Sequence, residues 1–277
     1  MNTDDVAKLF NLTGQVVAVT GGTGILGSEL VCGLAAAGAS VVILDRNLDP
    51  VPGLMERLGP AACNALAVQG DVLSLDSLQQ AAQAVIGRFG RIDALINGAG
   101  GNRPQATTNK ETPFFDLPAD ALRWVIDLNL MGTVLPSQVF GKLMAGRGEG
   151  AILNISSMNA FRPLTRIPAY SASKAGVSNF TQWLAVHMAQ EYSPRIRVNA
   201  IAPGFFQTTQ NEYLLTDPAT GQLTARGQSI IAHTPMARFG KPEDLLGTVL
   251  WLLSPGAAFV TGIVVPIDGG FSAFSGV

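Results

Sequence analysis

The chain has 277 residues, of which 47% are hydrophobic and 14% are charged, and its formal net charge is −2. This length can close one sizeable α/β core and does not require a second domain, so we expect a single domain over residues 1–277. Lysine and arginine are dispersed along the chain, which argues against nucleic acid or an anionic membrane as a partner.

The N-terminal residues 1–12 contain Asp4 and Asp5 and lack the apolar core of a secretory signal, so we read them as a lead-in to the first strand. The only two cysteines, Cys32 and Cys63, form no CxxC pair, so neither a disulfide framework nor a metal site is predicted. A cytoplasmic location fits this pattern.

The mean hydropathy of +0.29 is high for a monomer in water. We therefore expect a homo-oligomer, a dimer or a tetramer, with apolar helix surface in its interfaces. The most apolar stretch, Leu245–Ile267, is interrupted by Ser254, Pro255 and Gly256, which predicts a short helix and a strand rather than a membrane span.

The first predicted unit is a strand at Gln15–Thr20, a glycine turn at Gly21–Gly27 and a helix of small residues at Ser28–Ala37. Gly22, Gly24 and Gly27 match the G-x-G-x-x-G pattern. Such glycines let the backbone approach a pyrophosphate at the start of a helix, which favours a dinucleotide site here.

A second strand, "SVVILDR", ends at Asp45 and Arg46. A carboxylate at this position can accept hydrogen bonds from an adenosine ribose, although an aspartate that caps a helix would explain it as well. Asp45 would repel a 2′-phosphate, so we expect NAD(H) rather than NADP(H). Arg46 weakens that argument, because its guanidinium can stack on adenine or meet a phosphate.

Alternation of strands and helices continues to the end of the chain. Strand segments begin at Ala65, Asp93, Gly150, Arg195 and Gly262, and helical stretches include Leu75–Phe89, Pro118–Met144 and Ala169–Met188. This order predicts an α/β fold of the Rossmann type, a doubly wound parallel sheet with helices on both faces. Ligands of such sheets bind beyond the carboxyl ends of the strands. The longest irregular stretches, Gly101–Asp116 and Phe205–Arg226, are expected to border the substrate.

Tyr170 and Lys174 are four residues apart and share one face of a predicted helix. An ammonium group beside a phenol favours the phenolate, so we expect the pKa of Tyr170 to be lowered towards working pH. The pair taken alone is also compatible with an incidental contact on a surface helix. His187 and the methionines are interpreted as helix surface and core filler, not as metal ligands.

These motifs together resemble the short-chain dehydrogenase/reductase superfamily, and the similarity runs from Leu12 to about Phe271. It rests on the glycine turn, on "NGAG" and "DLNLMG", on Ser157 and the Tyr170/Lys174 pair, and on "PG" and "DGG". The resemblance implies that Tyr170 transfers a proton, that Lys174 perturbs the pKa of Tyr170 and anchors a ribose, and that Ser157 holds the substrate oxygen. It also implies a water-linked proton path through Asn129.

For the cofactor, the resemblance implies contacts along the whole row of strand ends. These residues are Gly21, Thr23, Gly24, Ile25, Leu26, Asp45, Arg46, Asp71, Val72, Asn97, Gly98, Ala99, Gly100, Tyr170, Lys174, Pro203, Gly204, Phe206 and Thr208. Two departures from the family pattern are present. Ile25 occupies the middle glycine position of the turn, and Gly98 stands where a second asparagine is common.

At a finer level the segments "INGAGGN", "SSMNAFRPLT", "APGFFQT" and "DGGFSAFSGV" resemble the D-mannonate oxidoreductase branch, also called fructuronate reductase. A polyhydroxy acid needs polar and cationic groups. The candidate substrate residues are Asn102, Arg103, Ser157, Asn159, Arg162 and His233. Arg162 is the expected partner of a carboxylate, because a guanidinium can grip one with two hydrogen bonds.

Two alternatives remain open. A 3-oxoacyl or other keto reductase would need an apolar pocket, which Met158, Phe161, Phe205 and Phe206 could form. A regulatory protein that binds a dinucleotide without catalysis would predict loss of catalytic residues, whereas Asn129, Ser157, Tyr170 and Lys174 are all present.

Overall fold

Seven parallel strands form one sheet in the order β3-β2-β1-β4-β5-β6-β7. The strands are β1 (Val16–Thr20), β2 (Ser40–Asp45), β3 (Ala65–Gln69), β4 (Ala94–Asn97), β5 (Gly150–Ile155), β6 (Ile196–Pro203) and β7 (Val264–Ile267). The computed structural model describes residues 2–207, 215–217 and 220–276. The direction of winding reverses between β1 and β4, which is where a doubly wound sheet opens a crevice for ligands.

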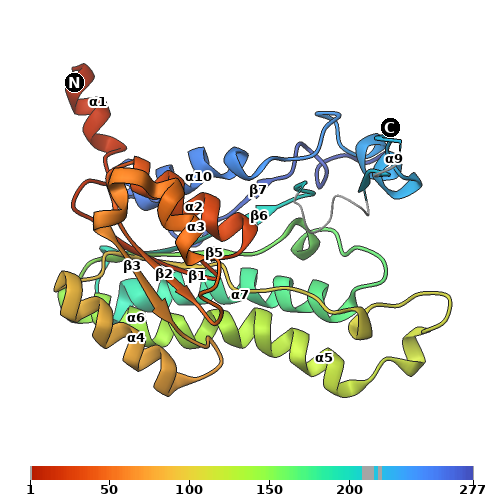
Figure 1. The fold of residues 1–277 in the computed structure, drawn as a ribbon, viewed down its shortest axis with the longest axis horizontal. Helices are drawn as coiled ribbons and strands as arrows, with labels where there is room; N and C mark the ends of the chain where they lie inside the picture. Colours follow the sequence, from red (N-terminus) through yellow and green to blue (C-terminus); the bar gives the residue numbers. More distant parts are fainter. Residues whose placement is uncertain (1, 208–214, 218–219, 277) are drawn as a thin grey trace.

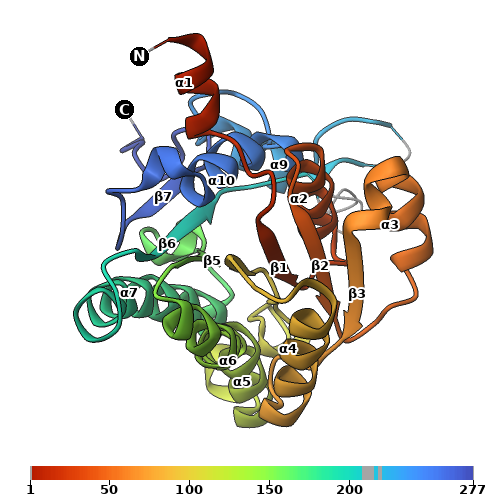
Figure 2. The same cartoon turned by 90° about the vertical axis from the view of Figure 1, so that its left-hand side faces the viewer.

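Helices cover both faces of this sheet (Figures 1 and 2). On one face lie α2, α3 and α10, and on the other lie α4, α5, α6 and α7. The helices are α1 (Thr3–Leu9), α2 (Ile25–Ala36), α3 (Val51–Leu58), α4 (Leu75–Phe89), α5 (Ala119–Ile126), α6 (Gly132–Arg147), α7 (Pro168–Glu191), α9 (Ala225–Ala232) and α10 (Leu246–Leu253). The predicted fold class is therefore confirmed.

Successive strand residues enter two separate cores, one on each side of the sheet. In β1, Val17 and Val19 pack in the core beneath α2 and α10, whereas Val16 and Ala18 pack in the core beneath α4 and α6. Because both sides are covered, all five residues of β1 are buried. This explains why the strand reads as a continuous apolar run rather than an alternating one.

The predicted helix Pro118–Met144 is not a single α-helix. It consists of α5 and α6 joined by a π-helical turn at Asp127–Met131. Within this turn, Nδ2 of Asn129 donates a hydrogen bond to the carbonyl of Val125, and the carbonyl of Asn129 accepts one from Oγ1 of Thr133. The Asn129 side chain thus takes a helical carbonyl that a backbone amide would otherwise use, and such competition is a recognised cause of local distortion.

Three helices were not predicted from the sequence. Residues 1–12, expected to be only a lead-in, contain α1, which begins with a capping box between Asn2 and Asp5. The other two, α3 and α9, have eight residues each. Helices this short carry little apolar periodicity.

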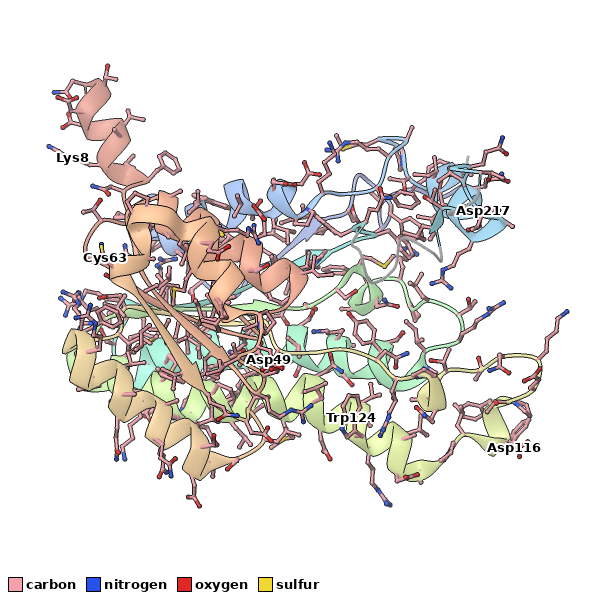
Figure 3. The ribbon with its side chains drawn as sticks, in the orientation of Figure 1. Lys8, Asp49, Cys63, Asp116, Trp124 and Asp217 are labelled. Carbon is pink, nitrogen blue, oxygen red and sulfur yellow. The ribbon has the colours of Figure 1, made fainter. Side chains whose placement is uncertain are left out.

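The interruption predicted at Ser254 is confirmed, because α10 ends at Leu253 and β7 begins only at Val264. Within the described ranges, the structure contains no helix that is both long and apolar enough to cross a bilayer. Cys32 and Cys63 are free thiols, and Cys63 lies at the surface (Figure 3).

Candidate active site

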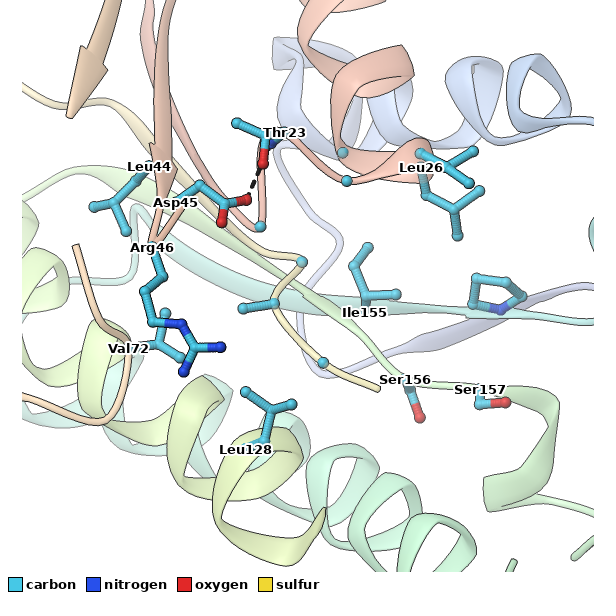
Figure 4. A pocket seen from close by; sticks show the side chains of 18 of the residues that line it. Thr23, Leu26, Leu44, Asp45, Arg46, Val72, Leu128, Ile155, Ser156 and Ser157 are labelled. Carbon is cyan, nitrogen blue, oxygen red and sulfur yellow. Dashed lines mark hydrogen bonds between the residues drawn. The ribbon is translucent and has the colours of Figure 1, made fainter. Parts of the chain in front are cut away.

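A cavity of about 610 Å³ lies at the carboxyl ends of the central strands (Figure 4). Most of the residues predicted to contact a cofactor line it. They are Gly21, Thr23, Gly24, Ile25, Leu26, Asp45, Arg46, Asp71, Val72, Gly98, Ala99, Gly100, Tyr170, Pro203, Gly204 and Phe206. Ser157 lines it too, so predicted cofactor and catalytic residues share one cavity.

The glycine turn packs too closely for side chains at three of its positions, and at Gly22 a Cβ would lie 2.9 Å from the carbonyl oxygen of Val19. Gly21 has a φ of +67°, and a Cβ there would lie 2.9 Å from the backbone of Ala99. A Cβ on Gly27 would lie 2.1 Å from the carbonyl oxygen of Gly21. The turn leads into α2, which starts at Ile25 and has no side-chain cap. The free amides of this helix start are suited to an anion such as a pyrophosphate, even though Ile25 replaces the middle glycine.

Asp45 and Arg46 follow β2 at the edge of the cavity (Figure 4). Oδ2 of Asp45 accepts a hydrogen bond from the amide of Thr23 at 3.1 Å, so the carboxylate braces the glycine turn. The helix-cap interpretation of Asp45 is wrong, because α3 is preceded by Pro50 as its cap residue. The Arg46 side chain extends beside Val72 on the opposite wall (Figure 4).

Asn97 does not line the cavity with its side chain. It is buried, and its Nδ2 donates to Oγ of Ser137 at 2.9 Å and to Oδ1 of Asn154 at 2.8 Å. The amide therefore ties β4 to its neighbours beneath the cavity floor. Thr208 lies outside the described residues.

Sequence reasoning missed several lining residues, namely Leu44, Gly70, Leu73, Trp124, Leu128, Ile155 and Ser156. Most of them neighbour a predicted residue, so the same motifs could have suggested them. Leu128 adjoins Asn129 within "DLNLMG". Trp124 is different, because it lies on α5, which carries no cofactor motif (Figure 3). Only the packing of α5 beside α7 brings it to the cavity.

The two adjacent serines after β5 have different surroundings. Oγ of Ser156 donates to the carbonyl of Lys174 at 3.1 Å and is 2.7 Å from Oγ of Ser178, so it fastens β5 to α7. Oγ of Ser157 accepts from the backbone amide of Asn159 at 3.2 Å. Ser157 also influences the phenol of Tyr170 by hydrogen bonding, and it is therefore the serine that faces the reactive tyrosine.

Lys174 is buried, and its Nζ donates a hydrogen bond to the carbonyl of Ile155 at 2.6 Å. Nζ lies 5.7 Å from the ring centroid of Tyr170. Burial lowers the pKa of Lys174 from 10.5 to about 8. Burial also raises the pKa of Tyr170 above 10.0, and the hydrogen bond from Ser157 opposes this only in part. The predicted lowering of the Tyr170 pKa is therefore wrong for this structure, because burial raises this pKa more than the hydrogen bond from Ser157 lowers it.

Asn129 lies behind Lys174 and is fully buried. Its Oδ1 accepts from the amide of Gly101 at 3.1 Å, and its Nδ2 donates to the carbonyl of the same residue at 2.7 Å. A Cβ on Gly100 would lie 2.8 Å from Oδ1 of Asn129 and 3.4 Å from Nζ of Lys174. Asn129 and Lys174 therefore flank the same short piece of backbone.

The predicted substrate residues fall into separate groups. Asn102 is exposed and donates to Oγ1 of Thr107, and the Arg103 guanidinium lies 4.6 Å from the ring of Trp124. Arg162 and His233 line a cavity of about 320 Å³ with Phe271. The structure therefore does not bring all the predicted substrate residues around one point.

Asn159 contacts protein with both ends of its amide. Its Oδ1 accepts from the amide of Leu164 at 2.9 Å and from Oγ of Ser171 at 3.1 Å, while its Nδ2 faces Oγ of Ser157 at 3.4 Å. With only 5% of its surface exposed, Asn159 orients Ser157 rather than offering free groups to a ligand.

The cavity as a whole fits a nicotinamide dinucleotide. It offers an uncapped helix start for a pyrophosphate, a carboxylate for a ribose, and apolar walls from Val72 and Phe206 for the rings. Its volume is within the range of ordinary ligand pockets, about 300–1,000 Å³.

Comparison with known proteins agrees with this geometry. Residues 15–219 match the profile of the short chain dehydrogenase family. An uncharacterised oxidoreductase of Bacillus subtilis, UxuB, is 48% identical over 276 residues, which cover 96% of this chain and 98% of the relative.

Two solved structures are also similar over nearly their full length. One is a Haemophilus influenzae protein with bound NAD, for which D-mannonate oxidoreductase is a provisional assignment. It is 44% identical, has a TM-score of 0.90 and covers 98% of this chain and 100% of its own. The other is a gluconate 5-dehydrogenase of Burkholderia cenocepacia in complex with NADP and tartrate, which is 30% identical, with a TM-score of 0.85 and coverage of 97% and 99%.

The profile match, these identities and the shared fold agree with the cavity described above. The chain belongs to the short-chain dehydrogenase family and is an NAD(P)-dependent oxidoreductase that acts on alcohol and ketone groups.

Proposed function

We propose that the protein interconverts a secondary alcohol and a ketone of a sugar acid, with D-mannonate and D-fructuronate as the substrate pair. The observation that carries the reaction type is the placement of Ser157 beside Tyr170 at the wall of the dinucleotide cavity. The similarity to the Haemophilus influenzae protein supports the choice of substrate.

In this proposal the bound dinucleotide supplies or accepts the hydride. Ser157 donates a hydrogen bond to the substrate oxygen, and Asn159 holds the Ser157 hydroxyl in place. Tyr170 gives its phenolic proton to the ketone oxygen during reduction and takes it back during oxidation. Because its pKa is raised, Tyr170 is protonated at neutral pH, which suits reduction, and oxidation should accelerate as the pH rises.

Lys174 and Asn129 act behind the tyrosine. The ammonium of Lys174 is within reach of Tyr170 and lies beside Gly100 at the cavity wall, where a ribose would bind. Asn129 supports a proton path to Lys174, since both flank the backbone of Gly100 and Gly101. These roles agree with the family pattern.

For the cofactor we propose NAD(H) rather than NADP(H). The Asp45 carboxylate lines the cavity and would repel a 2′-phosphate. Replacing it in Asp45→Ala should shift the ratio of kcat/KM values towards NADP by about tenfold, because one charge contact is worth roughly 1.5 kcal/mol and Arg46 stays in place. An unchanged ratio would show that Asp45 does not select the cofactor.

We also propose a homo-oligomer, a dimer or a tetramer. Trp183 and Val186 on α7 and Tyr192 directly after it are each 57% exposed, and the ring of Trp183 stacks on His187 with centroids 4.8 Å apart. An apolar stripe of this kind is typical of a subunit interface. Light scattering would give the number of subunits. The cytoplasmic location stays a prediction.

A substrate panel tests the proposed reaction. Uronates, aldonates and 3-oxoacyl thioesters are offered with each dinucleotide, and the absorbance of the reduced nicotinamide is followed. Highest activity on D-fructuronate and D-mannonate is expected. Preference for an acyl substrate would favour the alternative keto reductase, for which Phe205 and Phe206 supply apolar wall; Met158, by contrast, is buried in the protein.

A further inference from the structure

A second cavity of about 540 Å³ lies next to the dinucleotide cavity, and Phe205 lines both of them. We call it the outer cavity and define it by Arg166, Phe205, Arg226, Ser229, His233 and Phe271. Its residues come from the loop before α7, from α9 and from the C-terminal segment. The two sides of the cavity are therefore far apart in sequence.

The outer cavity carries uncompensated positive charge. Among the described residues, its wall contains the guanidinium groups of Arg166 and Arg226 and no aspartate or glutamate. Within the part of the chain that the structure describes, neither arginine takes part in an ion pair. Several other arginines of this part of the chain also lack an ion pair, so the distinguishing feature is that two of them line one cavity, where an anion can meet both.

Arg226 occupies a position that an anion would make more favourable, and Arg166 lies on a loop with an unusual backbone conformation. Arg226 lies in the first turn of α9, which has no acidic residue there, so its charge adds to the positive end of the helix dipole. Arg166 has a φ of +77°, which is uncommon for a residue with a side chain. Its carbonyl accepts a hydrogen bond from the amide of Thr108 at 2.8 Å, which ties this loop to the stretch Gly101–Asp116.

The outer cavity also adjoins the cavity that Ser157 and Tyr170 line, because Phe205 belongs to both. Arg166 is four residues before Tyr170, on the loop that connects Ser157 to α7. A ligand whose alcohol or ketone meets Tyr170 can therefore extend past Phe205 into the outer cavity. Ser229 and Thr165 offer hydroxyl groups along that wall.

We infer that Arg166 and Arg226 bind the carboxylate of the sugar acid. This assignment rests on the proposed function and refines it. It also replaces the expectation from sequence that Arg162 does so. Nε of Arg162 donates to the carbonyl of Ser272 at 3.2 Å, and its side chain lines the smaller cavity of about 320 Å³ instead of the outer one.

The test compares D-mannonate with D-mannitol, in which a CH₂OH group replaces the carboxylate. Arg166 and Arg226 are both exposed, so solvent screening limits the strength of each contact with the carboxylate. We expect Arg166→Gln and Arg226→Gln each to lower kcat/KM for D-mannonate about tenfold. The double variant should lose more than either single variant, and the departure of its loss from the product of the two single losses measures their coupling through the shared carboxylate. Activity on D-mannitol should change little in all three, and Arg226→Lys should recover part of the loss. Arg123→Gln, an exposed arginine on α5, is the matched control.

Binding gives a second readout that does not depend on turnover. Calorimetric titration of D-mannonate into the complex of the enzyme with NADH should show the same loss of affinity in the variants. Added salt should weaken the binding of D-mannonate and leave the binding of D-mannitol unchanged.

The outcomes separate the two proposals. A wild type without activity on any sugar acid would overturn the proposed function. A wild type that prefers D-mannonate, with variants that keep this preference or lose activity on both compounds equally, would overturn the outer cavity as the carboxylate site while the proposed function stands. A larger selective loss in Arg162→Gln than in Arg226→Gln would return the assignment to Arg162.

Discussion

The dinucleotide cavity and the outer cavity are built in opposite ways. The first is formed by strand ends and a tight turn, in which Gly21, Gly27 and Gly98 have no room for a side chain. The second is formed by long segments that carry exposed arginines. A dinucleotide is held largely by backbone and by a helix start, whereas a particular substrate is selected by side chains on loops. We therefore expect cofactor binding and hydride transfer to depend on the first cavity, and the choice of substrate to depend on the second.

The largest effect is expected for Tyr170→Phe, in the dinucleotide cavity. Removing one hydroxyl should lower turnover about a hundredfold or more, because it removes the group that transfers the proton. The melting temperature and the affinity for NADH should stay close to those of the wild type, since the ring and the dinucleotide cavity are retained. Turnover near that of the wild type would contradict the role of Tyr170.

A second test uses Lys174, whose pKa is about 8 in the folded protein and 10.5 when exposed. Between these values the unfolded chain holds a proton that the folded protein has released, so the stability of the wild type should rise with pH. The rise should reach about 3 kcal/mol at most, since the pKa difference corresponds to roughly 1.36 kcal/mol per unit. Lys174→Met should lack this rise.

Urea unfolding of the wild type and of Lys174→Met across this pH range measures the effect. Identical pH dependence in the two proteins would show that the ammonium group is not desolvated.

A third test pairs a glycine of the tight turn with a glycine of the loop Gly101–Asp116. Gly27→Ala should destabilise the protein by about 1–3 kcal/mol, because the new Cβ would lie 2.1 Å from the Gly21 carbonyl oxygen. Gly101→Ala, in the loop towards the substrate, meets no atom within 4 Å and should change stability by about 0.5 kcal/mol or less. Melting temperatures of the two variants measure the difference. Equal losses of stability in the two variants would mean that the loop around Gly101 is packed as tightly as the turn around Gly27.

Much of this protein can be read from its sequence because the relevant patterns are local. The strand at Gln15–Thr20, the turn that follows it and the helix Leu75–Phe89 lie where periodicity and glycine spacing put them. The spacing of Tyr170 and Lys174 likewise follows from one helix, α7. Local spacing determines such features before the chain folds.

Which way each side chain points, and which groups surround it, were decided only by the tertiary structure. The adjacent residues Ser156 and Ser157 have different hydrogen-bond partners because α7 packs on β5. The amide of Asn159 is hydrogen-bonded within the protein, to Ser157, Leu164 and Ser171. The raised pKa of Tyr170 depends on how much protein surrounds it, which no spacing reveals. Arg166 and Arg226 share a cavity although 60 positions separate their numbers, because the loop before α7 and the start of α9 meet only in the folded chain. Long-range packing, not local pattern, therefore brought the cations to the substrate side.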